Sequence, residues 1–556
     1  MKKNFITVYC ENTNQEYTIP TGSSLSEFKE IVFPHNHNDI LGALVNNELQ
    51  DLHYEVFKPK HINFVNVTSL DGYSVYSRSL IFVLYYAIKQ LYPPKTLVVE
   101  FSISNGIFCR IANKDFHLDA GKIVEIKEKM KEVVQLDIPI LREETPTEEA
   151  IRLFKKEGLK DKALLLSTRG KVYTSVYSIL DVHNYFYGTL APSTGCLKVF
   201  DLLSYKDGML LMPPQRTQPT KTSVLFLQDK LFNVQSEYKR NGKDMGVAHI
   251  GDLNRLIEEK HFGSLIKISE ALHEKKISFI ADQIKKRRKK VKVIMIAGPS
   301  SSGKTTLGKR LAVHLMVNGI RPVNLSLDNY FVNREDTPKD EKGEYDFETI
   351  DALDLDLFNQ NILSLLREEE VLLPKFSFET GQRFYDDEKL RINQKNVIII
   401  EGIHGLNPKL TEHLPQECLF KIFISALTSI SIDNHNVISP SDNRLIRRMV
   451  RDYKYRNYSA LDTLKRWESV LSGEQKHIVP YQEEADATFN TALTYELSAL
   501  KQSAVPLLEE VRDKFPEHSK ALRLLKFFSY VQSIPIWEIP PTSILREFLG
   551  GSSFKY

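Results

Sequence analysis

The stretch Val293-Ile-Met-Ile-Ala-Gly-Pro-Ser-Ser-Ser-Gly-Lys-Thr-Thr306 decides the fold of the second half of this chain. Its four apolar residues, 293–296, predict a buried parallel strand, and the apolar spacing after residue 306 predicts a helix. Between them, the two glycines and the Lys-Thr pair satisfy the pattern G-x-x-x-x-G-K-[ST]. The sequence therefore predicts a strand, a glycine-rich loop and a helix, in the order that binding of a nucleoside triphosphate requires.

The residues of this loop have separate predicted tasks. Backbone N–H groups of the loop and the N-terminus of the following helix can cradle phosphates. The Lys304 side chain can reach the β- and γ-phosphates of ATP, and the Thr305 hydroxyl can bind Mg²⁺. A chance Gly/Ser turn is the alternative, and the Lys-Thr pair with its flanking strand and helix argues against it. The predicted ATP-binding residues are Gly298, Ser300, Ser301, Ser302, Gly303, Lys304, Thr305 and Thr306.

The composition is that of an ordinary globular protein. Hydrophobic residues make up 42% and charged residues 26% of the 556 residues, and the formal net charge of +3 gives no overall field that would attract nucleic acid or a membrane. The four cysteines lie far apart, the N-terminus has no signal-peptide pattern, and the longest apolar run is far shorter than the ~20 residues that span a bilayer. We therefore expect a cytoplasmic protein with reduced cysteines and no membrane partner.

The patterning along the chain predicts a multidomain protein of mixed α/β and α+β class. The predicted segments are a β-grasp domain (1–62), an α+β domain (63–215), a helical connector (216–290), the nucleotide domain (291–500) and a helical C-terminal segment (501–556). In the nucleotide domain, strands alternate with helices, which predicts a parallel sheet with helices on both faces. In the α+β domain, the expected strands are 96–101, 163–167 and 209–212.

A basic run, Lys285-Lys-Arg-Arg-Lys-Lys290, precedes the nucleotide domain. It could be a nucleic-acid patch. The interpretation that we favour is a solvated helix end, where cations suit the C-terminal dipole.

Two acidic residues follow strands of the nucleotide domain. Asp328 comes after the second strand, at the sheet edge where ligands bind in such folds, and could accept a proton from a substrate hydroxyl; a helix-capping role is the alternative. Glu401 directly follows four apolar residues, as a Walker-B acid does. We predict that Glu401 binds Mg²⁺ opposite Thr305.

An arginine-rich helix is predicted over 442–452. Arg444, Arg448 and Arg451 recur at spacings of four and three and therefore share one face. Arginines held over a transferring phosphoryl group stabilise its charge. A face paired with acids such as Asp442 and Asp452 is the alternative, and the spacing alone does not separate the two.

Taken together, these residues resemble the uridine kinase/phosphoribulokinase family of P-loop kinases over about 291–495. The matching phrases are Gly298–Thr306, Ser326–Phe331, Tyr345–Asp354, Leu373–Phe378, Ile400–Ile403 and Arg444–Asp452. The resemblance implies that Lys304, Asp328, Arg448 and Arg451 are catalytic, with Asp328 as the base for a sugar 5′-hydroxyl. It also implies an acceptor site made by Asp328, Tyr330, Glu348, Phe376, Arg383 and Arg448.

The resemblance has departures on the acceptor side. The histidine that reads the pyrimidine in uridine kinases aligns with Gly381, and Phe376 and Glu348 stand where a tyrosine and an aspartate are usual. His404 is closer to the phosphoribulokinase side of the family. The phosphoryl-transfer residues are therefore present, whereas the residues for pyrimidine recognition are not all retained.

The first 215 residues resemble the front of threonyl-tRNA synthetase, with a TGS domain over 1–62 and an editing-type domain behind it. The matching phrases are Ala87–Pro93, Arg142–Ala150 and Tyr187–Gly195. The four histidine and cysteine positions of the synthetase site align with Arg78, Phe82, Phe186 and Leu190. These side chains cannot hold a metal or hydrolyse an ester, so we predict that this domain does not edit aminoacyl-tRNA.

The favoured hypothesis is an ATP- and Mg²⁺-dependent kinase for the 5′-hydroxyl of a nucleoside. One alternative is a nucleotide-dependent regulator associated with RNA or tRNA, with the synthetase-like half as its binding module. Another is a kinase for a non-nucleoside sugar alcohol, which fits His404 and Gly381. The sequence leaves the acceptor, the oligomeric state and the task of the front half open; a homo-oligomer is compatible with it.

Overall fold

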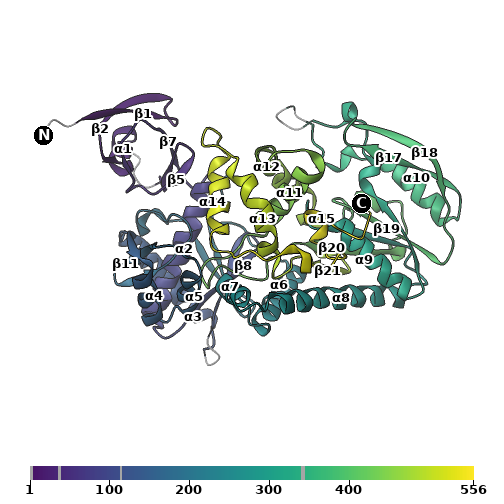
Figure 1. Ribbon diagram of the computed structural model, residues 1–556, viewed down its shortest axis with the longest axis horizontal. Coiled ribbons are helices and arrows are strands. Elements are labelled where there is room, and N and C mark those ends of the chain that lie inside the picture. Colours follow the sequence, from purple (N-terminus) through teal and green to yellow (C-terminus); the bar gives the residue numbers. More distant parts are fainter. Residues whose placement is uncertain (1–3, 35–38, 113–115, 340–342, 344, 556) are drawn as a thin grey trace.

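The computed structural model describes residues 4–34, 39–112, 116–339, 343 and 345–555. Its first part, at the purple end of Figure 1, is a five-stranded sheet of order β2-β1-β7-β4-β5 in which β1 and β7 are parallel. Ser24 caps the single helix through a capping box with Glu27. This is the expected β-grasp domain. Its elements are β1 (Phe5–Cys10), β2 (Gln15–Pro20), β3 (Ser23–Ser24), α1 (Leu25–Val32), β4 (Gly42–Val45), β5 (Glu48–Gln50), β6 (Glu55–Val56) and β7 (His61–Val65).

The second part contains a long buried helix, a four-stranded sheet of order β13-β14-β9-β8 and a three-stranded sheet of order β10-β11-β12. The α+β expectation is confirmed. Its elements are α2 (Leu70–Leu91), β8 (Leu97–Ile103), β9 (Gly106–Ile111), α3 (Ala120–Gln135), β10 (Leu141–Pro146), α4 (Thr147–Lys156), α5 (Lys160–Ser167), β11 (Tyr173–Ile179), β12 (Val182–Asn184), β13 (Asp201–Tyr205) and β14 (Gly208–Met212).

One expected strand of this part is wrong: 163–167 belongs to helix α5. Its apolar run is too short to show a period, so a buried strand and a buried helix look alike in the sequence. The run Ala163-Leu-Leu-Leu consists of strong helix formers. Gly251 of the next helical part lets the two backbones approach, since a Cβ there would lie 2.9 Å from the Leu165 nitrogen. Tertiary packing therefore favours the helix.

The connector is helical, as expected, and consists of α6 (Asp229–Asp244), α7 (Ile250–Glu258) and α8 (Phe262–Lys286). The basic run begins in the last turn of α8, which confirms the interpretation as a helix end. Arg287 then pairs with Asp486 at 2.8 Å and Lys290 with Glu417 at 3.2 Å.

The nucleotide domain contains a sheet of order β16-β19-β15-β20-β21 in which every neighbouring pair is parallel. Alternate residues of β15 face opposite sides. Ile294 and Ile296 join the core that contains α8 and α9, whereas Val293 and Met295 join the core that contains α10. Helices cover both faces, as Figure 1 shows. The elements are β15 (Val293–Ala297), α9 (Lys304–Val317), β16 (Arg321–Ser326), α10 (Leu355–Leu366), β19 (Asn396–Gly402), β20 (Leu419–Ser425) and β21 (Ala487–Asn490).

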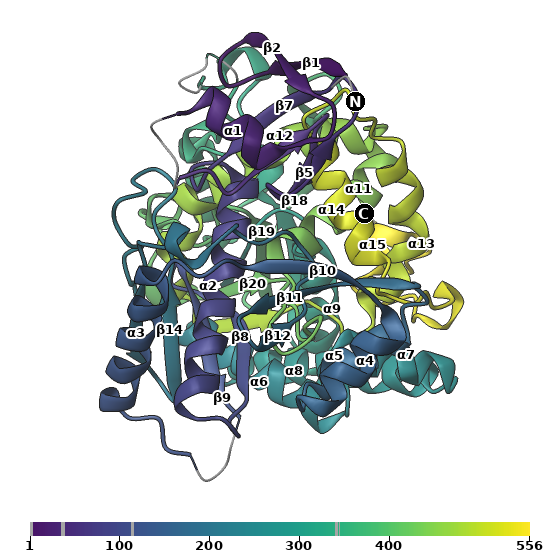
Figure 2. The ribbon, with the colours of Figure 1, turned by 90° about the vertical axis from the view of Figure 1, so that its left-hand side faces the viewer.

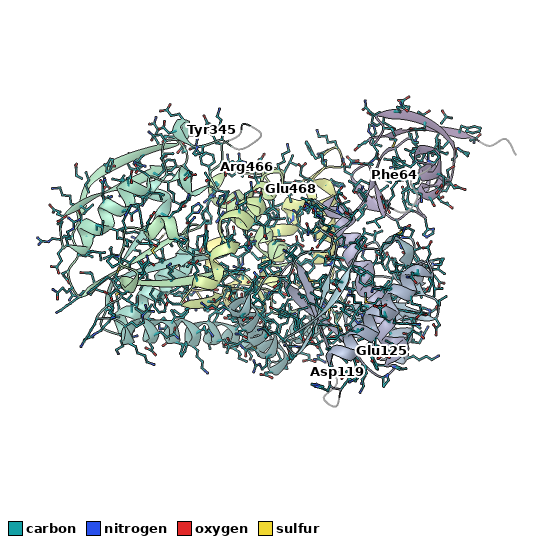
Figure 3. All side chains as sticks on the ribbon, turned by 180° about the vertical axis from the view of Figure 1, so that it is seen from behind. Phe64, Asp119, Glu125, Tyr345, Arg466 and Glu468 are labelled. Carbon is teal, nitrogen blue, oxygen red and sulfur yellow. The ribbon has the colours of Figure 1, made fainter. Side chains whose placement is uncertain are left out.

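A hairpin and a group of helices complete the nucleotide domain and the C-terminal segment. In Figure 3, Arg466 and Glu468 mark α12 between the hairpin end of the molecule and the β-grasp domain, which Phe64 marks. The elements are β17 (Val371–Ser377), β18 (Gln382–Leu390), α11 (Pro440–Arg456), α12 (Ala460–His477), α13 (Glu496–Glu509), α14 (His518–Phe528) and α15 (Arg546–Leu549). No helix among the described residues is long and apolar enough to cross a membrane.

The loop between β20 and α11 reaches into the synthetase-like part of the chain. In Figure 2 this part of the chain faces the viewer. Lys162 of α5 donates a hydrogen bond to Asp433 at 2.7 Å, and both side chains are fully buried. Next to them, the Val99 N–H donates to the Asn434 carbonyl, and the Asn434 N–H donates to Asp161. One continuous apolar core also runs from α2 through α8 to α13 and α14.

Candidate active site

The glycine-rich loop has the geometry that its sequence predicts. Gly303 caps α9 in the left-handed region with a φ of 88°, which favours glycine. A Cβ at Gly298 would lie 2.2 Å from the Ile424 carbonyl, so only glycine allows the loop to lie this close to β20. The loop therefore lies at the N-terminus of α9, where N–H groups without helical partners can bind phosphates.

The Lys304 ammonium lies at the centre of the acidic groups of the site. It donates to the carbonyl oxygens of Gly298 at 3.0 Å and Pro299 at 3.3 Å. Burial lowers its pKa, and the charges of Glu401 and Asp328 oppose that change. The structure thus brings together Lys304, Glu401 and Asp328, three residues that the sequence analysis had selected.

Glu401 lies at the carboxyl end of β19 and meets two hydroxyl groups. Its Oε1 accepts hydrogen bonds from Thr305 at 3.3 Å and from Ser326 at 3.0 Å. Burial and then the neighbouring Asp328 raise the pKa of Glu401 to about 7, so the carboxylate lacks full charge compensation. Mg²⁺ prefers oxygen ligands and is held by few protein groups when phosphates share it. Thr305 and Glu401 therefore fit a magnesium ion that also binds phosphates.

The described residues contain no group of three or more His, Cys, Asp and Glu side chains that could hold a metal.

Asp328 lies on a short 3₁₀ turn, η2 (Leu327–Tyr330), directly after β16. Burial raises the pKa of its carboxyl group, and the charges of Lys304, Arg456 and Arg451 lower it. A raised pKa suits a carboxylate that takes a proton from a hydroxyl. The Asp328 side chain is not the cap of this turn. Ser326 is the cap, because its hydroxyl accepts a hydrogen bond from the Asp328 N–H.

The arginine face of α11 meets the glycine-rich loop. Arg448 donates to the Ser300 hydroxyl at 3.0 Å, and Arg444 donates to the Ser300 carbonyl at 3.3 Å. Arg448 and Arg451 also pair with Asp452, at 3.2 and 2.8 Å. Arg444 and Arg448 therefore contact the phosphate-binding loop, and Arg448 and Arg451 pair with an acid. A role of these arginines in phosphoryl transfer stays a prediction.

The acceptor side contains a second carboxylate. Burial raises the pKa of Glu348 to about 7, and the charges of Arg448 and Lys304 oppose the rise. Glu348 packs against Gly473 of α12: a Cβ added to Gly473 would lie 2.5 Å from the Glu348 Cβ. His404 is buried nearby, 5.8 Å from His477 between ring centroids, and burial followed by His477 lowers its pKa to about 4.

The other sequence-predicted acceptor residues support the site in different ways. Phe376 packs on Phe331 and Phe378 with ring centroids 5.6 and 5.3 Å apart, in an aromatic group that is partly exposed. Arg383 pairs with Asp354 at 2.8 Å and donates to the Tyr330 carbonyl. The Tyr330 ring is not at the site: it is 2% exposed and packs edge-on against Phe358 in the core.

Gly381 lies in the turn between β17 and β18 with a φ of 72°. The Arg334 guanidinium covers it, since a Cβ at Gly381 would lie 2.7 Å from the Arg334 Nε. The backbone N–H of Arg334 also donates a hydrogen bond to the Gly381 carbonyl at 2.8 Å. Gly381, which aligns with the base-reading histidine of uridine kinases, thus lies next to Arg334. The sequence analysis did not select Arg334.

Two more residues of the site, Arg456 and Glu547, were missed, whereas Asp452 pairs with the arginines as one of the sequence interpretations expected. Asp452 is 2% exposed and lies within ion-pair distance of Arg448, Arg451 and Arg456. The Arg456 charge acts on Asp328. Glu547, from the C-terminal segment, accepts a hydrogen bond from the Thr306 hydroxyl at 2.6 Å. The spacing of four after Asp452 could have indicated Arg456. No local pattern indicates Glu547.

The four positions that align with the synthetase site are occupied by packed side chains. Phe82 and Phe186 pack on each other at 5.5 Å and are fully buried, together with Leu190. Arg78 donates to the Thr189 carbonyl at 3.0 Å. The aligned positions are thus filled by core side chains and a backbone-bound arginine.

Comparison with known proteins agrees with these two parts. Residues 293–498 match the model of the "Phosphoribulokinase / Uridine kinase family". A uridine kinase of Ureaplasma urealyticum is 24% identical over 180 residues, which cover 32% of this chain and 78% of the relative.

The N-terminal region matches threonine–tRNA ligases. The relative from Aquifex aeolicus is 30% identical over 193 residues, 34% of this chain and 30% of the ligase. The chain thus spans less than a third of that ligase's length.

Among solved structures, a possible uridine kinase from Bacillus stearothermophilus aligns with 39% of this chain and 98% of its own, at 17% identity and a TM-score of 0.26. Residues 293–498 are therefore similar to the phosphoribulokinase/uridine kinase family in sequence, and they contain the phosphate-binding loop before α9.

Proposed function

We propose that this protein transfers the γ-phosphoryl group of ATP to the 5′-hydroxyl of a nucleoside. The observation that carries the proposal is the position of Asp328, a buried carboxylate on which the charges of Lys304 and Arg451 act. A protein that only binds or hydrolyses a nucleotide as a switch needs no base for an acceptor hydroxyl. The neighbouring Glu348 and the aromatic group of Phe331, Phe376 and Phe378 supply the polar and stacking surfaces that a nucleoside would need.

The residues would divide the work as follows. Loop N–H groups and Lys304 hold the β- and γ-phosphates, while Arg448 and Arg451 neutralise charge that develops as the phosphoryl group moves. Asp328 orients the acceptor hydroxyl and takes its proton. Thr305 and Glu401 would hold Mg²⁺, which supplies further charge neutralisation when bound.

The direct test measures ADP released from ATP and Mg²⁺ by the full chain. A panel of ribo- and deoxyribonucleosides is compared with ribulose 5-phosphate and pantothenate-like alcohols. Release that depends on a nucleoside, with the phosphate found on the 5′-oxygen by ³¹P NMR, supports the proposal. Release that depends only on a non-nucleoside alcohol moves the acceptor to the alternative that Gly381 and His404 favour.

A second candidate, a nucleotide-dependent RNA-associated regulator, has one observation in its favour. Lys526 lies on α14, and burial together with the charges of four cations of the synthetase-like part lowers its pKa to about 8. These cations are Arg169, Arg78, Arg142 and Lys171. Such a cluster of cations attracts phosphates. ADP release stimulated by tRNA or a short RNA, with no response to any small acceptor, would place this candidate first.

A further inference from the structure

The last part of the C-terminal segment, residues 536–555, lies across the start of α9. Ile544 contacts Gly303, where a Cβ would lie 2.8 Å from the isoleucine Cγ2. Lys454 of α11 donates to the Leu549 carbonyl at 2.6 Å, and Lys309 of α9 donates to the Lys555 carbonyl. The segment is thus fastened to both helices that border the phosphate-binding loop.

One side chain of this segment enters the phosphate-binding place itself. The Glu547 Oε2 accepts hydrogen bonds from the Thr306 hydroxyl at 2.6 Å and from the Thr306 N–H at 3.3 Å. That N–H belongs to the first turn of α9, whose N–H groups have no partner within the helix. In a phosphate loop this turn binds the phosphates of the nucleotide. The carboxylate therefore occupies a position that a phosphate oxygen of ATP would take.

The charge of Glu547 also reaches the rest of the site. It supports the ammonium form of Lys304 and disfavours ionisation of Glu401. A polyphosphate that arrives at this place would meet a like charge on Glu547 and would compete with it for Thr306. Glu547 and the nucleotide thus have mutually exclusive contacts.

The backbone of the segment is fixed more firmly than the Glu547 side chain. Ile544, Leu545 and Phe548 are fully buried, and Phe548 lies 5.1 Å from the Arg447 guanidinium. Arg546 closes the segment on itself by donating to the Ile536 carbonyl at 2.9 Å. Glu547, in contrast, is partly exposed. Rotation of this one side chain is therefore enough to open the place at Thr306.

We propose that residues 536–555 form an intramolecular gate on the nucleotide site, in which the Glu547 carboxylate occupies a phosphate position at Thr306 and the incoming nucleotide displaces it. The proposal rests on the proposed function only in that the loop binds a nucleotide. It predicts that the wild-type chain binds ATP less tightly than its phosphate loop would allow.

The test measures the affinity of the full chain for MgATP and MgADP by calorimetry, without any acceptor. Glu547→Gln keeps the size of the side chain and removes the charge, and Glu547→Ala removes the competing group. Both should bind nucleotide at least fivefold more tightly than wild type. Glu538→Gln, an acid of the same segment away from Thr306, is the matched control and should stay within twofold. Lys304→Ala in the Glu547→Gln background should abolish the gain.

Unchanged or weaker binding by a folded Glu547→Gln variant overturns the gate, because Glu547 would then be neutral toward nucleotide or support it. The fold is checked by the thermal midpoint of each variant. Because the readout is nucleotide affinity, its outcome is separable from the kinase proposal. Tighter binding without turnover on any acceptor keeps the gate and rejects the kinase, and turnover with unchanged affinity does the reverse.

Discussion

In the proposed function, Asp328 is the residue that takes the proton of the acceptor hydroxyl. We expect Asp328→Asn to lower turnover by roughly two to four orders of magnitude, the usual range for a general base. ATP affinity should be nearly unchanged, since the loop and Lys304 bind the phosphates. Single-turnover phosphate transfer and nucleotide calorimetry measure the two quantities. Normal turnover by the variant would remove Asp328 from the role of base.

Gly473 has no side chain, and this leaves room for Glu348. Its Cβ would lie 2.5 Å from the Glu348 Cβ, a backbone-near atom that cannot swing aside. We expect Gly473→Ala to raise the KM for the acceptor about tenfold, because Glu348 must shift, and to leave nucleotide affinity unchanged. Gly308→Ala is the control: it adds the same methyl group to a helix where the nearest atom lies at 3.6 Å. A KM that stays at the wild-type value would show that Glu348 does not touch the acceptor.

At this scale, the sequence predicted residues whose role follows from a local pattern. Thr305, Asp328 and Glu401 lie at the ends of neighbouring parallel strands or at the loop, and parallel strands bring those ends together. Tyr330 was misplaced because a single 3₁₀ turn decides whether a side chain enters the site or the core, and no period shows that turn. Glu547 lies 241 residues from its partner Thr306, so its contact exists only in the folded chain.

Among the elements, α11 is held to α13 by a buried ion pair. Arg447 donates to Glu496 of α13 at 2.5 Å and to the Thr491 carbonyl at 2.9 Å, and both charged side chains are fully buried. Removing one partner leaves an uncompensated buried charge, which costs about 3–5 kcal/mol. We expect Arg447→Ala to lower the urea midpoint of unfolding accordingly.

Arg466→Ala is the control for this prediction, since Arg466 lies on the neighbouring α12 and covers the Tyr458 ring at 4.6 Å. Its loss should cost about 1 kcal/mol or less. Equal midpoints for the two variants would mean that Arg447 does not anchor α11.

The elements themselves could be predicted where a period is visible or a cap is present. The strand and helix around the phosphate loop, and the Ser24 cap of α1, are of this kind. The apolar run in α5 was assigned to a strand because eight residues give no period, and its packing against α7 decides its state.

At the scale of the whole molecule, buried neutral histidines link stability to pH. Burial and then the Arg310 charge lower the pKa of His273 to about 3, and its Nε2 lies 3.3 Å from the Ala492 carbonyl. The unfolded chain binds the proton near pH 6.5, whereas the folded chain does not until about pH 3. The unfolded state therefore gains protons first, and stability falls as the pH falls below 6.5.

We expect His273→Gln to be less stable than wild type at pH 7.5 and to lose less of its stability between pH 7 and pH 5. Thermal midpoints of both proteins across this range measure the difference. Parallel curves would show that His273 is as easily protonated in the folded chain as in the unfolded one.

The buried pair of Lys162 and Asp433 has a consequence for how this molecule can be divided. The pair joins α5 of the synthetase-like half to the loop that leads from β20 into the arginine helix. A cut after residue 215 would remove the lysine and leave the Asp433 carboxylate with hydrogen bonds from its own loop, donated by His435 and Asn436, but without its cation. The front half thus supplies part of the buried support for the loop that leads into α11, and the two halves do not form separable modules.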